Sequence, residues 1–523
     1  MAKLTIATAK YDQALKSCAA DEKPNLVLDL TKTTVVFEMS NLNKNFLRAL
    51  LMTGPTAQQR ALIQHMLGNQ NGVMGEAVKT PSSFANLMEV FVKPEIPTLL
   101  HKIGSRWYPV CVTRSSYHAG YSGEEGAASI GIMYKICEMT ITKDIYVTRS
   151  AFRDDRTKDP IVRTPLELLE ERGYRPLSDE VFSEWQDASE RAEALRERTG
   201  LVLDMHGTAL VSNPMLWRSN LDEIRVGTSS VPSIGIVESE LETEERNRHG
   251  RSESTATLPF IRAFSTDLKK YMYVDISDCV PHTFDVSAED RLHLPPKMGN
   301  IIKKVFSSPE IFGDMFSGRH GGMVLLANGP TGVGKTLTAE VFAEMTKRPL
   351  YVLEMGELGT NLATVESSLQ RVFARAARWN AVLLFDEADV FMAKRTDSDL
   401  ERSAIVGVFL RLLDRYAGMF FLTSNRADVI DPAFAGRITL RLDYPKIDHT
   451  TRAKIWKDML HAGGFEDFSL AFLSGIAELR DLNGREIRNQ VRLLKVLHPD
   501  GKITAEDVKE TLDLVPRKAL SEV

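Results

Sequence analysis

The stretch Gly329–Thr336, with the sequence GPTGVGKT, matches the pattern GxxxxGK[ST]. It follows the apolar run MVLLAN at residues 323–328 and precedes the helix-like pattern TLTAEVFAEM. A glycine-rich turn between a strand and a helix presents backbone amides to a phosphate group, and a lysine at this spacing adds positive charge. The sequence therefore predicts a phosphate-binding loop in its required strand, loop and helix context.

Within this loop each residue type has an expected task. Gly329, Gly332 and Gly334 allow the backbone to fold its amides around the phosphates. Lys335 is expected to reach the β- and γ-phosphates, and Thr336 to offer its hydroxyl to Mg²⁺. The other residues expected to contact the nucleotide are Pro330, Thr331, Val333 and Leu337.

A second apolar run, AVLLFDEAD at residues 381–389, ends in the acidic pair Asp386 and Glu387. Alone, a strand that ends in Asp-Glu is often a surface turn. Together with the phosphate-binding loop it is typical of a Walker B motif. Asp386 would then hold Mg²⁺ through its water shell, and Glu387 would orient and deprotonate the attacking water.

The next apolar run, MFFLTSN, ends at Asn425, and Arg437 follows twelve residues later within DPAFAGRI. The neutral amide of Asn425 could fix the water or the γ-phosphate without adding repulsive charge. The guanidinium of Arg437 could neutralise transition-state charge on a nucleotide in a neighbouring subunit. We therefore include both residues among the catalytic candidates, with Lys335 and Glu387.

From about residue 294, apolar strand-like runs alternate with helical patterns, which indicates a parallel sheet wrapped by helices. With the ordered motifs GPTGVGKT, LLFDEAD, LTSNR and DPAFAGRI, the region 294–515 resembles an AAA+ ATPase module of the AAA clade. Residues 389–426 also resemble a microbial or fungal group of AAA family ATPases, in which a variable N-terminal region precedes one ATPase module.

The resemblance implies an α/β fold: a P-loop αβα nucleotide-binding subdomain at 291–445 and a helical lid at 446–523. It also implies ATP and Mg²⁺ as cofactors, and a homo-oligomeric ring, often a hexamer, with ATP at the subunit interfaces. Arg485, within NGREIRNQ, falls where many AAA+ proteins carry a lid arginine that reaches the γ-phosphate; a surface salt bridge is the alternative for this residue.

Two departures from the family pattern concern the arginine finger and the pore. Many members carry two arginines three residues apart, but here the earlier position is Phe434, so that Arg437 stands alone. The stretch expected to form the first pore loop, GELGTNLATVESS, offers Leu358 and Leu362 in place of an aromatic residue, which argues against processive peptide threading. Lys394 and Arg395 would line the channel as a second loop or form a solvated charge run.

The part of the chain before the module is expected to have an α+β fold. Residues 1–160 have mixed α/β patterning, and residues 161–290 contain an amphipathic helical pattern after Asp179, a hairpin pattern in TLPFIRAF and YMYVDI, and a charged linker at 238–257. The glycine-rich run Gly120–Gly131 predicts a loop.

Composition excludes several classes of protein. The 523 residues include 65 Lys and Arg and 70 Asp and Glu, so a formal net charge of −5 gives no global attraction to nucleic acid or to an anionic membrane. No apolar run approaches the roughly 20 residues needed to cross a bilayer, and the N-terminus lacks the apolar stretch of a secretory signal. We expect a cytoplasmic protein without membrane insertion.

The function expected from these features is Mg²⁺-dependent ATP hydrolysis coupled to the remodelling of a protein or macromolecular assembly, with a protein target chosen by the residues before the module. One alternative is a nucleic-acid-associated motor or loader in which Lys394 and Arg395 contact a phosphate backbone. The other is a nucleotide-gated oligomeric scaffold, in which ATP binding assembles the ring and hydrolysis resets it.

Overall fold

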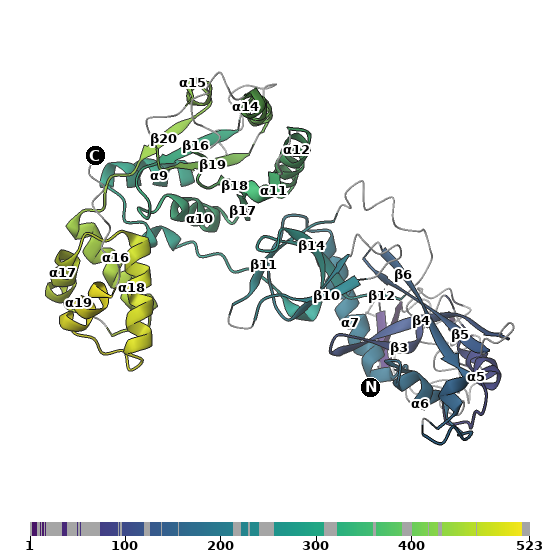
Figure 1. Cartoon of the computed structure of the whole chain (residues 1–523). Helices are drawn as coiled ribbons and strands as arrows, with labels where there is room; N and C mark the ends of the chain where they lie inside the picture. The colour runs from purple at the N-terminus through teal and green to yellow at the C-terminus, as the bar shows by residue number, and fades with distance from the viewer. Residues whose placement is uncertain are drawn as a thin grey trace. The chain divides into compact units, whose positions relative to one another are not determined.

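A computed structural model describes residues 3–7, 34–38 and 74–514, with a few single residues between 11 and 53. The segments left out after residue 74 are 93, 95–96, 120–125, 138, 155, 213–220, 229–230, 240–255, 308–321, 359–361, 390–399, 417, 427–430 and 467. The chain divides into two compact units (Figure 1). Unit 1 comprises residues 1–199 and 203–281, and unit 2 comprises residues 200–202 and 282–523.

Unit 1 contains a six-stranded sheet in the order β12-β5-β4-β3-β7, with β6 paired to β5. Its strands are β3 (Pro97–Ile103), β4 (Arg106–His118), β5 (Ala127–Ile136), β6 (Met139–Thr148), β7 (Tyr174–Pro176) and β12 (Thr257–Leu258). Helices α5 (Pro81–Met88) and α6 (Pro165–Glu170) each begin at a threonine capping box. A separate two-stranded sheet joins β1 (Lys3–Ala7) and β2 (Thr34–Glu38).

The loop predicted for Gly120–Gly131 is wrong in its second half. Strand β5 already begins at Ala127, and the paired residues Ser116 and Ser129 continue the ladder with β4 close to the turn. Gly131 lies inside the strand, where a Cβ would meet Thr113 Oγ1 at 2.6 Å. The glycine there permits close packing in a sheet and does not mark a turn.

A seven-stranded sheet completes unit 1, in the order β10-β9-β14-β13-β11-β8-β15. Its strands are β8 (Val202–Met205), β9 (Thr208–Ser212), β10 (Leu221–Arg225), β11 (Ser233–Val237), β13 (Phe260–Ser265), β14 (Lys270–Asp275) and β15 (Cys279–Pro281). The predicted hairpin is confirmed, because β13 and β14 pair antiparallel. The predicted helix is also confirmed as α7 (Asp179–Arg196), which buries Trp185 and Ala192.

Most of the predicted charged linker lies outside the described residues, but its two ends do not fit an exposed segment. Glu238 is buried and donates its backbone N–H to Arg262 O, and Thr257 belongs to β12. The part of the linker that could be exposed is therefore shorter than the predicted 238–257.

Unit 2 begins with a parallel five-stranded sheet in the order β17-β18-β19-β16-β20. The strands are β16 (Met323–Asn328), β17 (Leu350–Leu353), β18 (Val382–Phe385), β19 (Met419–Ser424) and β20 (Leu440–Asp443). Every residue of β16, β18 and β19 is buried, as expected for strands covered on both faces. This confirms the predicted P-loop α/β fold.

Helices cover both faces of this sheet (Figure 1). They are α9 (Pro296–Ser307), α10 (Lys335–Thr346), α11 (Met355–Leu358), α12 (Leu362–Arg378), α14 (Leu400–Leu413) and α15 (Pro432–Ala435). Phe342 of α10 packs against Phe421 on one face, whereas Phe373 of α12 and Phe409 of α14 pack against Phe420 on the other. Successive side chains of β19 therefore pack against helices on opposite faces of the sheet.

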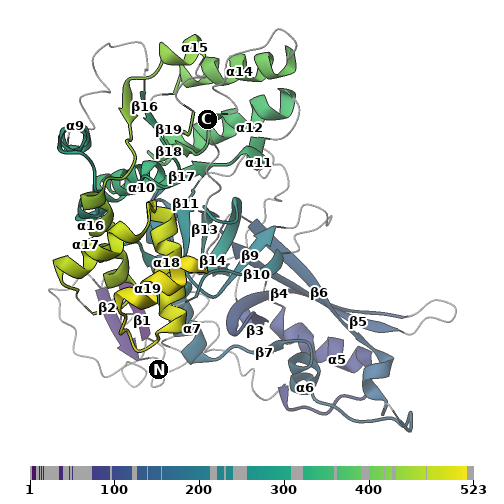
Figure 2. The same cartoon turned by 60° about the vertical axis from the view of Figure 1, so that its left-hand side comes forward.

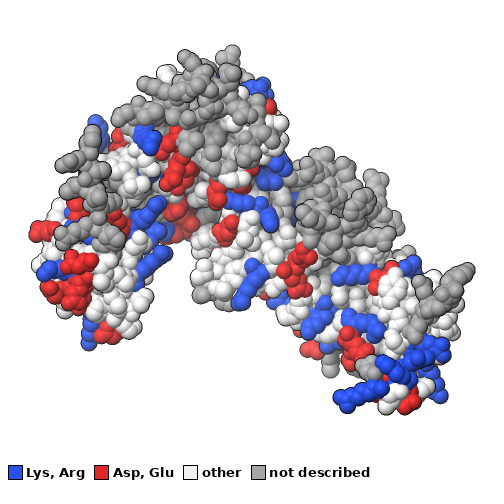
Figure 3. All heavy atoms as spheres, in the orientation of Figure 1, with Lys and Arg blue, Asp and Glu red and all other residues white. Residues whose placement is uncertain are grey.

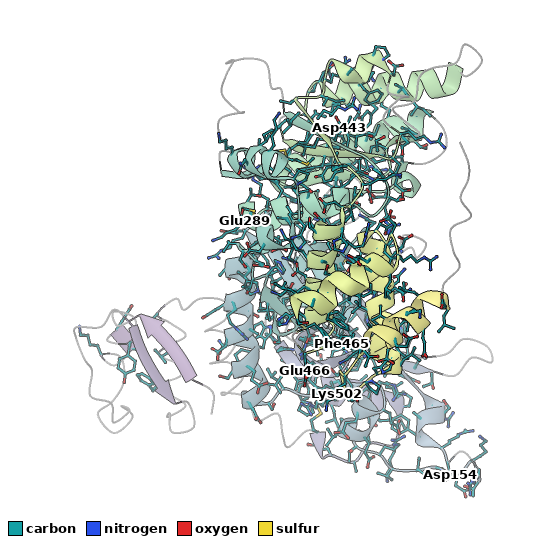
Figure 4. The ribbon with its side chains drawn as sticks, turned by 90° about the vertical axis from the view of Figure 1, so that its left-hand side faces the viewer. Asp154, Glu289, Asp443, Phe465, Glu466 and Lys502 are labelled. Carbon is teal, nitrogen blue, oxygen red and sulfur yellow. The ribbon has the colours of Figure 1, made fainter. Side chains whose placement is uncertain are left out.

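Four helices form the lid, which Figure 2 shows as a compact group: α16 (His449–Ala462), α17 (Leu470–Leu479), α18 (Gly484–Leu497) and α19 (Ala505–Asp513). The predicted face of Ile487, Val491 and Leu494 is buried in their common core. Phe465, labelled in Figure 4, is buried in the same core. The predicted cap at Thr504 is confirmed as a capping box with Asp507.

Of the two pore candidates, the structure excludes Leu358 and does not test Leu362. Leu358 is 1% exposed at the end of α11, so it is a core residue and cannot present its side chain to a channel. Leu362 begins α12, and its side chain, like Lys394 and Arg395, lies outside the described residues.

On the face drawn in Figure 3, basic and acidic side chains gather in small groups of both signs. Among the described residues, no helix is long and apolar enough to cross a membrane.

Candidate functional site

The phosphate-binding loop lies between β16 and α10, and its glycines occupy conformations that other residues rarely adopt. Gly329, Gly332 and Gly334 have φ values of 148°, 75° and 101°. A Cβ on Gly329 would lie 2.4 Å from Tyr444 O, and one on Gly332 would lie 2.4 Å from Asn483 Oδ1. Two of the three glycines are therefore required both by backbone conformation and by close neighbours.

Lys335 is the first residue of α10 and is 7% exposed. Its ammonium group donates hydrogen bonds to Gly329 O at 2.7 Å, to Pro330 O at 2.6 Å and to Asn425 Oδ1 at 2.7 Å. Burial lowers the pKa of Lys335, while the carboxylates of Asp386 and other nearby acids oppose this shift. The charge is thus partly desolvated, and three hydrogen bonds compensate for the lost water.

Asp386 directly follows β18 and lies between two threonines. Thr336 Oγ1 donates to its carboxylate oxygens at 3.0 and 3.2 Å, and Thr423 Oγ1 donates to Oδ1 at 2.5 Å. The predicted partners Thr336 and Asp386 are therefore in contact. Their hydroxyl and carboxylate oxygens are the ligand types that Mg²⁺ prefers.

Glu387 has a φ of 53°, in the left-handed region. Its N–H donates to Thr423 Oγ1 at 2.8 Å. Asn425, at the end of β19, is held by Asp389, whose two carboxylate oxygens each accept a bond of 3.2 Å from the Asn425 N–H. Asp389 also accepts a hydrogen bond from Ser424 Oγ. These contacts fix the strand ends from which the catalytic candidates project.

The lid contacts the phosphate-binding loop directly. Gly484 N donates a 2.9 Å hydrogen bond to Gly332 O, and Asn483 caps α18 through a capping box with Glu486. Arg485 therefore lies at the helix N-terminus nearest the loop, and its positive charge contributes to the lowered pKa of Lys335. Arg485 is therefore close enough to Lys335 for the two positive charges to repel each other.

One pocket of about 800 Å³ joins these parts of unit 2. Its polar part contains the predicted residues Thr331, Gly332, Gly334, Lys335, Thr336, Asp386, Glu387, Asn425 and Arg485. Its apolar part contains Leu292, Leu294, Val333, Leu337, Ile455 and Met459. A pocket lined both by the phosphate-binding loop and by apolar side chains fits a nucleotide, which has a charged phosphate part and a flat base.

Two lining residues that are far apart in the sequence contact each other. His293 Nε2 lies 2.5 Å from Asp458 Oδ2, which connects the segment before α9 to lid helix α16. This segment follows the 3₁₀ helix η6 (Ala288–Arg291), which contains Glu289, labelled in Figure 4. The pocket therefore takes its walls from both the nucleotide-binding subdomain and the lid.

Another acidic residue, Glu340 on α10, also lines the pocket. Partial desolvation by the pocket walls raises its pKa, and the charges of Arg488 and Arg291 oppose the shift. Arg488 and Arg291 line the same pocket from the lid and from the segment before α9. The charge of Glu340 therefore faces arginines from two other parts of unit 2.

Arg437 is not among the residues that line this pocket, within the described part of the chain. Its guanidinium makes a two-point contact with Asp414, at 2.6 Å from Nε and 2.8 Å from Nη2, and Nη1 donates to Ala433 O at 2.7 Å. The hydrogen bonds to Asp414 raise the pKa of Arg437. Phe434, where a second arginine would stand, is 1% exposed and packs against Phe409.

The donor set fits ATP with Mg²⁺. The loop supplies the buried ammonium of Lys335 for the phosphates, and the Thr336–Asp386 contact supplies oxygen ligands beside it. Among the described residues no group of three or more His, Cys, Asp or Glu side chains could hold a metal. A site for Mg²⁺ needs no such group, because this ion binds through one or two protein ligands, water and substrate phosphates.

Several residues of the site were not predicted from the sequence. Thr423 and Asp389 act on the catalytic candidates through hydrogen bonds, and Asp414 acts in the same way on Arg437. Asp389 had a usable signal, since it completes the run DEAD after the apolar strand. Thr423 lies within the quoted motif LTSNR, but nothing in the motif indicates its contacts with the acids after β18. Asp414 had no signal, because an aspartate after a helical pattern is common.

Comparison with known proteins finds a family model and several relatives that match part of this chain. Residues 325–446 match the sequence model of the family described as "ATPase family associated with various cellular activities (AAA)". The chain is 28% identical over 207 residues to "ATP-dependent zinc metalloprotease FtsH 1" of Phytoplasma mali, which covers 36% of this chain and 34% of that protein. It is 31% identical over 122 residues to "Uncharacterized AAA family ATPase y4kL" of Sinorhizobium fredii, which covers 23% of this chain and 36% of that protein. The chain spans about a third of the length of these relatives.

Two solved structures are similar at low identity. One is "Structure of E. coli MS115-1 HORMA:CdnC:Trip13 complex", at 16% identity and a TM-score of 0.37, which covers 45% of this chain and 94% of that chain. The other is "Crystal structure of FIGL-1 AAA domain in complex with ADP", at 19% identity and a TM-score of 0.35, which covers 44% of this chain and 85% of that chain.

Proposed function

We propose that this chain, an AAA+ ATPase, couples ATP hydrolysis to the remodelling of a protein or macromolecular assembly, and that it acts as a homo-oligomer. The observation that carries the proposal is the direct hydrogen bond between Gly484 of the lid and Gly332 of the phosphate-binding loop. Because the loop must rearrange when it binds and releases phosphates, this contact would carry the change into the lid.

In the proposed reaction the loop binds the triphosphate first. Lys335 exchanges its bonds to Gly329 O and Pro330 O for phosphate oxygens, since an ammonium has three donors to redistribute. Thr336 and Asp386 would hold Mg²⁺, the first directly and the second through water. When bound, this ion neutralises charge that develops on the phosphates.

Glu387 would then orient and deprotonate the attacking water, and Asn425 would position the water or the γ-phosphate. The hydrogen bond between Asn425 and Lys335 supports this role, because Lys335 is the residue proposed to bind the same phosphate. A neutral amide and a carboxylate at neighbouring strand ends can divide the tasks of positioning and proton transfer. Arg485 would approach the γ-phosphate from the lid.

Arg437 would act on the nucleotide of a neighbouring subunit. Its position outside the pocket of its own subunit and its fixed, two-point contact with Asp414 support an action in trans. Each site would then be complete only in an assembly, for which we propose a hexameric ring. We also propose domain boundaries after residues 160, 290 and 445. For the location of the protein we propose the cytoplasm.

The proposal is tested by ATP turnover per subunit, measured over a range of protein concentrations for the wild type and Glu387→Gln. We expect turnover per subunit to rise cooperatively with concentration in the wild type and to be abolished in the variant, which should still bind ATP. Turnover that is independent of concentration would contradict an interface-assembled site. Strong stimulation by DNA, with a steep salt dependence, would instead favour a nucleic-acid motor.

A further inference from the structure

We propose that Thr423 is a positioning residue for hydrolysis, which fixes the conformations of both acidic residues after β18. This inference rests on the proposed roles of Asp386 and Glu387 and extends them. It concerns a residue of β19 whose side chain is 1% exposed and whose neighbours on both sides are strands of the same sheet.

The two acids pose a geometric problem. Successive residues of an extended strand point to opposite faces of a sheet, yet Asp386 and Glu387 both line the nucleotide pocket. The chain must therefore leave the extended conformation where these two residues stand. Strand β18 ends at Phe385, and Glu387 takes a φ of 53°, a region that residues other than glycine rarely adopt. A neighbouring group has to hold this conformation in place.

Thr423 supplies that group through three hydrogen bonds. Its Oγ1 accepts from the Glu387 N–H at 2.8 Å and donates to Asp386 Oδ1 at 2.5 Å. Its backbone O accepts from the Ala388 N–H at 3.0 Å. The contacts reach three consecutive residues of the turn, so that they define the turn's path as well as the orientation of one carboxylate.

The position of Thr423 follows from the register of the sheet. The last paired residues of β18 and β19 are Phe385 and Leu422, so Thr423 is the first residue of β19 beyond the ladder. On its other side Thr423 still pairs with Ala327 of β16. On one side, pairing with β16 therefore holds the backbone of Thr423 in the sheet. On the other side, Thr423 can form hydrogen bonds with the turn that carries Asp386 and Glu387.

Only a hydroxyl group can make both side-chain contacts. It donates its single hydrogen to Asp386 and accepts from Glu387 N–H with a lone pair. Valine has the same shape and would preserve packing, but it would leave the Glu387 N–H and one carboxylate oxygen without these partners. Serine could restore both bonds. The pair of substitutions Thr423→Val and Thr423→Ser therefore separates hydrogen bonding from packing.

Thr423 also differs from the other threonine at this carboxylate. Thr336 belongs to the phosphate-binding loop, and its hydroxyl is expected to turn toward the bound phosphates and ion. Thr423 belongs to a central strand and does not depend on the loop. It can therefore keep Asp386 oriented while Thr336 changes partners.

The experiment compares Thr423→Val, Thr423→Ser and the control Thr511→Val in the full chain. Thr511 is a buried threonine in lid helix α19 whose hydroxyl donates to Val508 O of its own helix. We expect Thr423→Val to lower kcat roughly ten- to a hundredfold. Its affinity for a fluorescent ATP analogue should be nearly unchanged, and the Mg²⁺ concentration for half-maximal turnover should rise severalfold. Thr423→Ser should recover most of the turnover, and Thr511→Val should match the wild type.

Two outcomes would overturn the inference. The first is wild-type kcat in Thr423→Val. The second is equal loss of activity in the valine and serine variants together with a lower thermal midpoint, which would mean that Thr423 only packs the sheet. Glu387→Gln, measured alongside, separates this inference from the proposed function: if that variant still hydrolyses ATP, the role of Glu387 itself is wrong.

Discussion

The ammonium of Lys335 and the side-chain oxygen of Asn425 lie 2.7 Å apart and share a hydrogen bond, although 90 residues separate them in the sequence. The contact joins the phosphate-binding loop to the end of β19. Because both groups would face the γ-phosphate, their spacing sets where that phosphate can lie. Changes at Asn425 should therefore affect turnover more than binding.

We expect Asn425→Ala to lower kcat roughly ten- to a hundredfold and to change KM for ATP little, because it removes an interaction needed mainly in the transition state. Asn425→Asp should weaken ATP binding as well, since it adds a negative charge near the phosphates. Steady-state ATPase kinetics test both variants, with Asn300→Ala on the exposed side of α9 as control. Unchanged kcat in Asn425→Ala would remove Asn425 from the catalytic group.

Gly332 should be intolerant of any side chain. In Gly332→Ala the new Cβ would lie 2.4 Å from Asn483 Oδ1 at a φ of 75°, so the substitution strains the loop and separates it from the lid. We expect ATP affinity to fall more than about tenfold, measured by titration with a fluorescent analogue. Gly299→Ala is the matched control. It has open space for a Cβ in α9 and should stabilise the protein by about 0.5–1 kcal/mol without loss of binding. Equal affinities in the two variants would show that the contact with Asn483 is unimportant.

Asp414 should act through Arg437. Its two-point contact holds the guanidinium in one orientation, so Asp414→Ala should lower turnover about three- to tenfold while ATP binding stays intact. Glu506→Ala removes a carboxylate from an exposed pair with Lys509 in the lid and should have no effect. If Asp414→Ala also fails to change turnover, the orientation of Arg437 does not depend on this pair.

Unit 1 should lose stability in mild acid through His101. Burial, helped by the charge of Lys143, lowers the pKa of this histidine to about 4 from 6.5, and its ring stacks on Tyr174. Because the folded state favours the neutral ring, this contribution to stability is complete above pH 6.5 and is lost as the pH falls toward 4. We expect the thermal midpoint of His101→Phe, which keeps the stacked ring, to fall less than that of the wild type between pH 7.5 and pH 5. Parallel pH profiles for the two proteins would contradict this account.

The parts of the site that the sequence predicts are those whose chemistry is local. The phosphate-binding loop, the acids after β18 and Asn425 after β19 each follow an apolar run within a few residues. Because the carboxyl ends of parallel strands meet at one edge of a sheet, these short motifs can be brought together without knowledge of the remaining chain. The lid helices are similarly local, through their periodicity and their caps.

What the sequence does not predict depends on tertiary contacts. His293 and Asp458 are 165 residues apart, and nothing in either neighbourhood indicates the other. Leu358 has the size expected of a pore residue, but it is buried where α11 packs on α12. In unit 1, Gly131 resembles a loop residue in the sequence. The sequence does not show that side-chain atoms of Thr113 and Arg114 lie where a Cβ on this residue would be.

Mixing two inactive variants tests whether Arg437 completes the ATP site of a neighbouring subunit. Arg437→Ala keeps the acids of its own site, and Glu387→Gln keeps its arginine. When the two are mixed in equal amounts and allowed to exchange subunits, random assembly should pair an intact pocket with an intact arginine at roughly a quarter of the interfaces. We predict that the mixture regains about that fraction of wild-type turnover, although each variant alone is nearly inactive. A mixture no more active than its components, or an Arg437→Ala protein that hydrolyses ATP normally, would contradict the account.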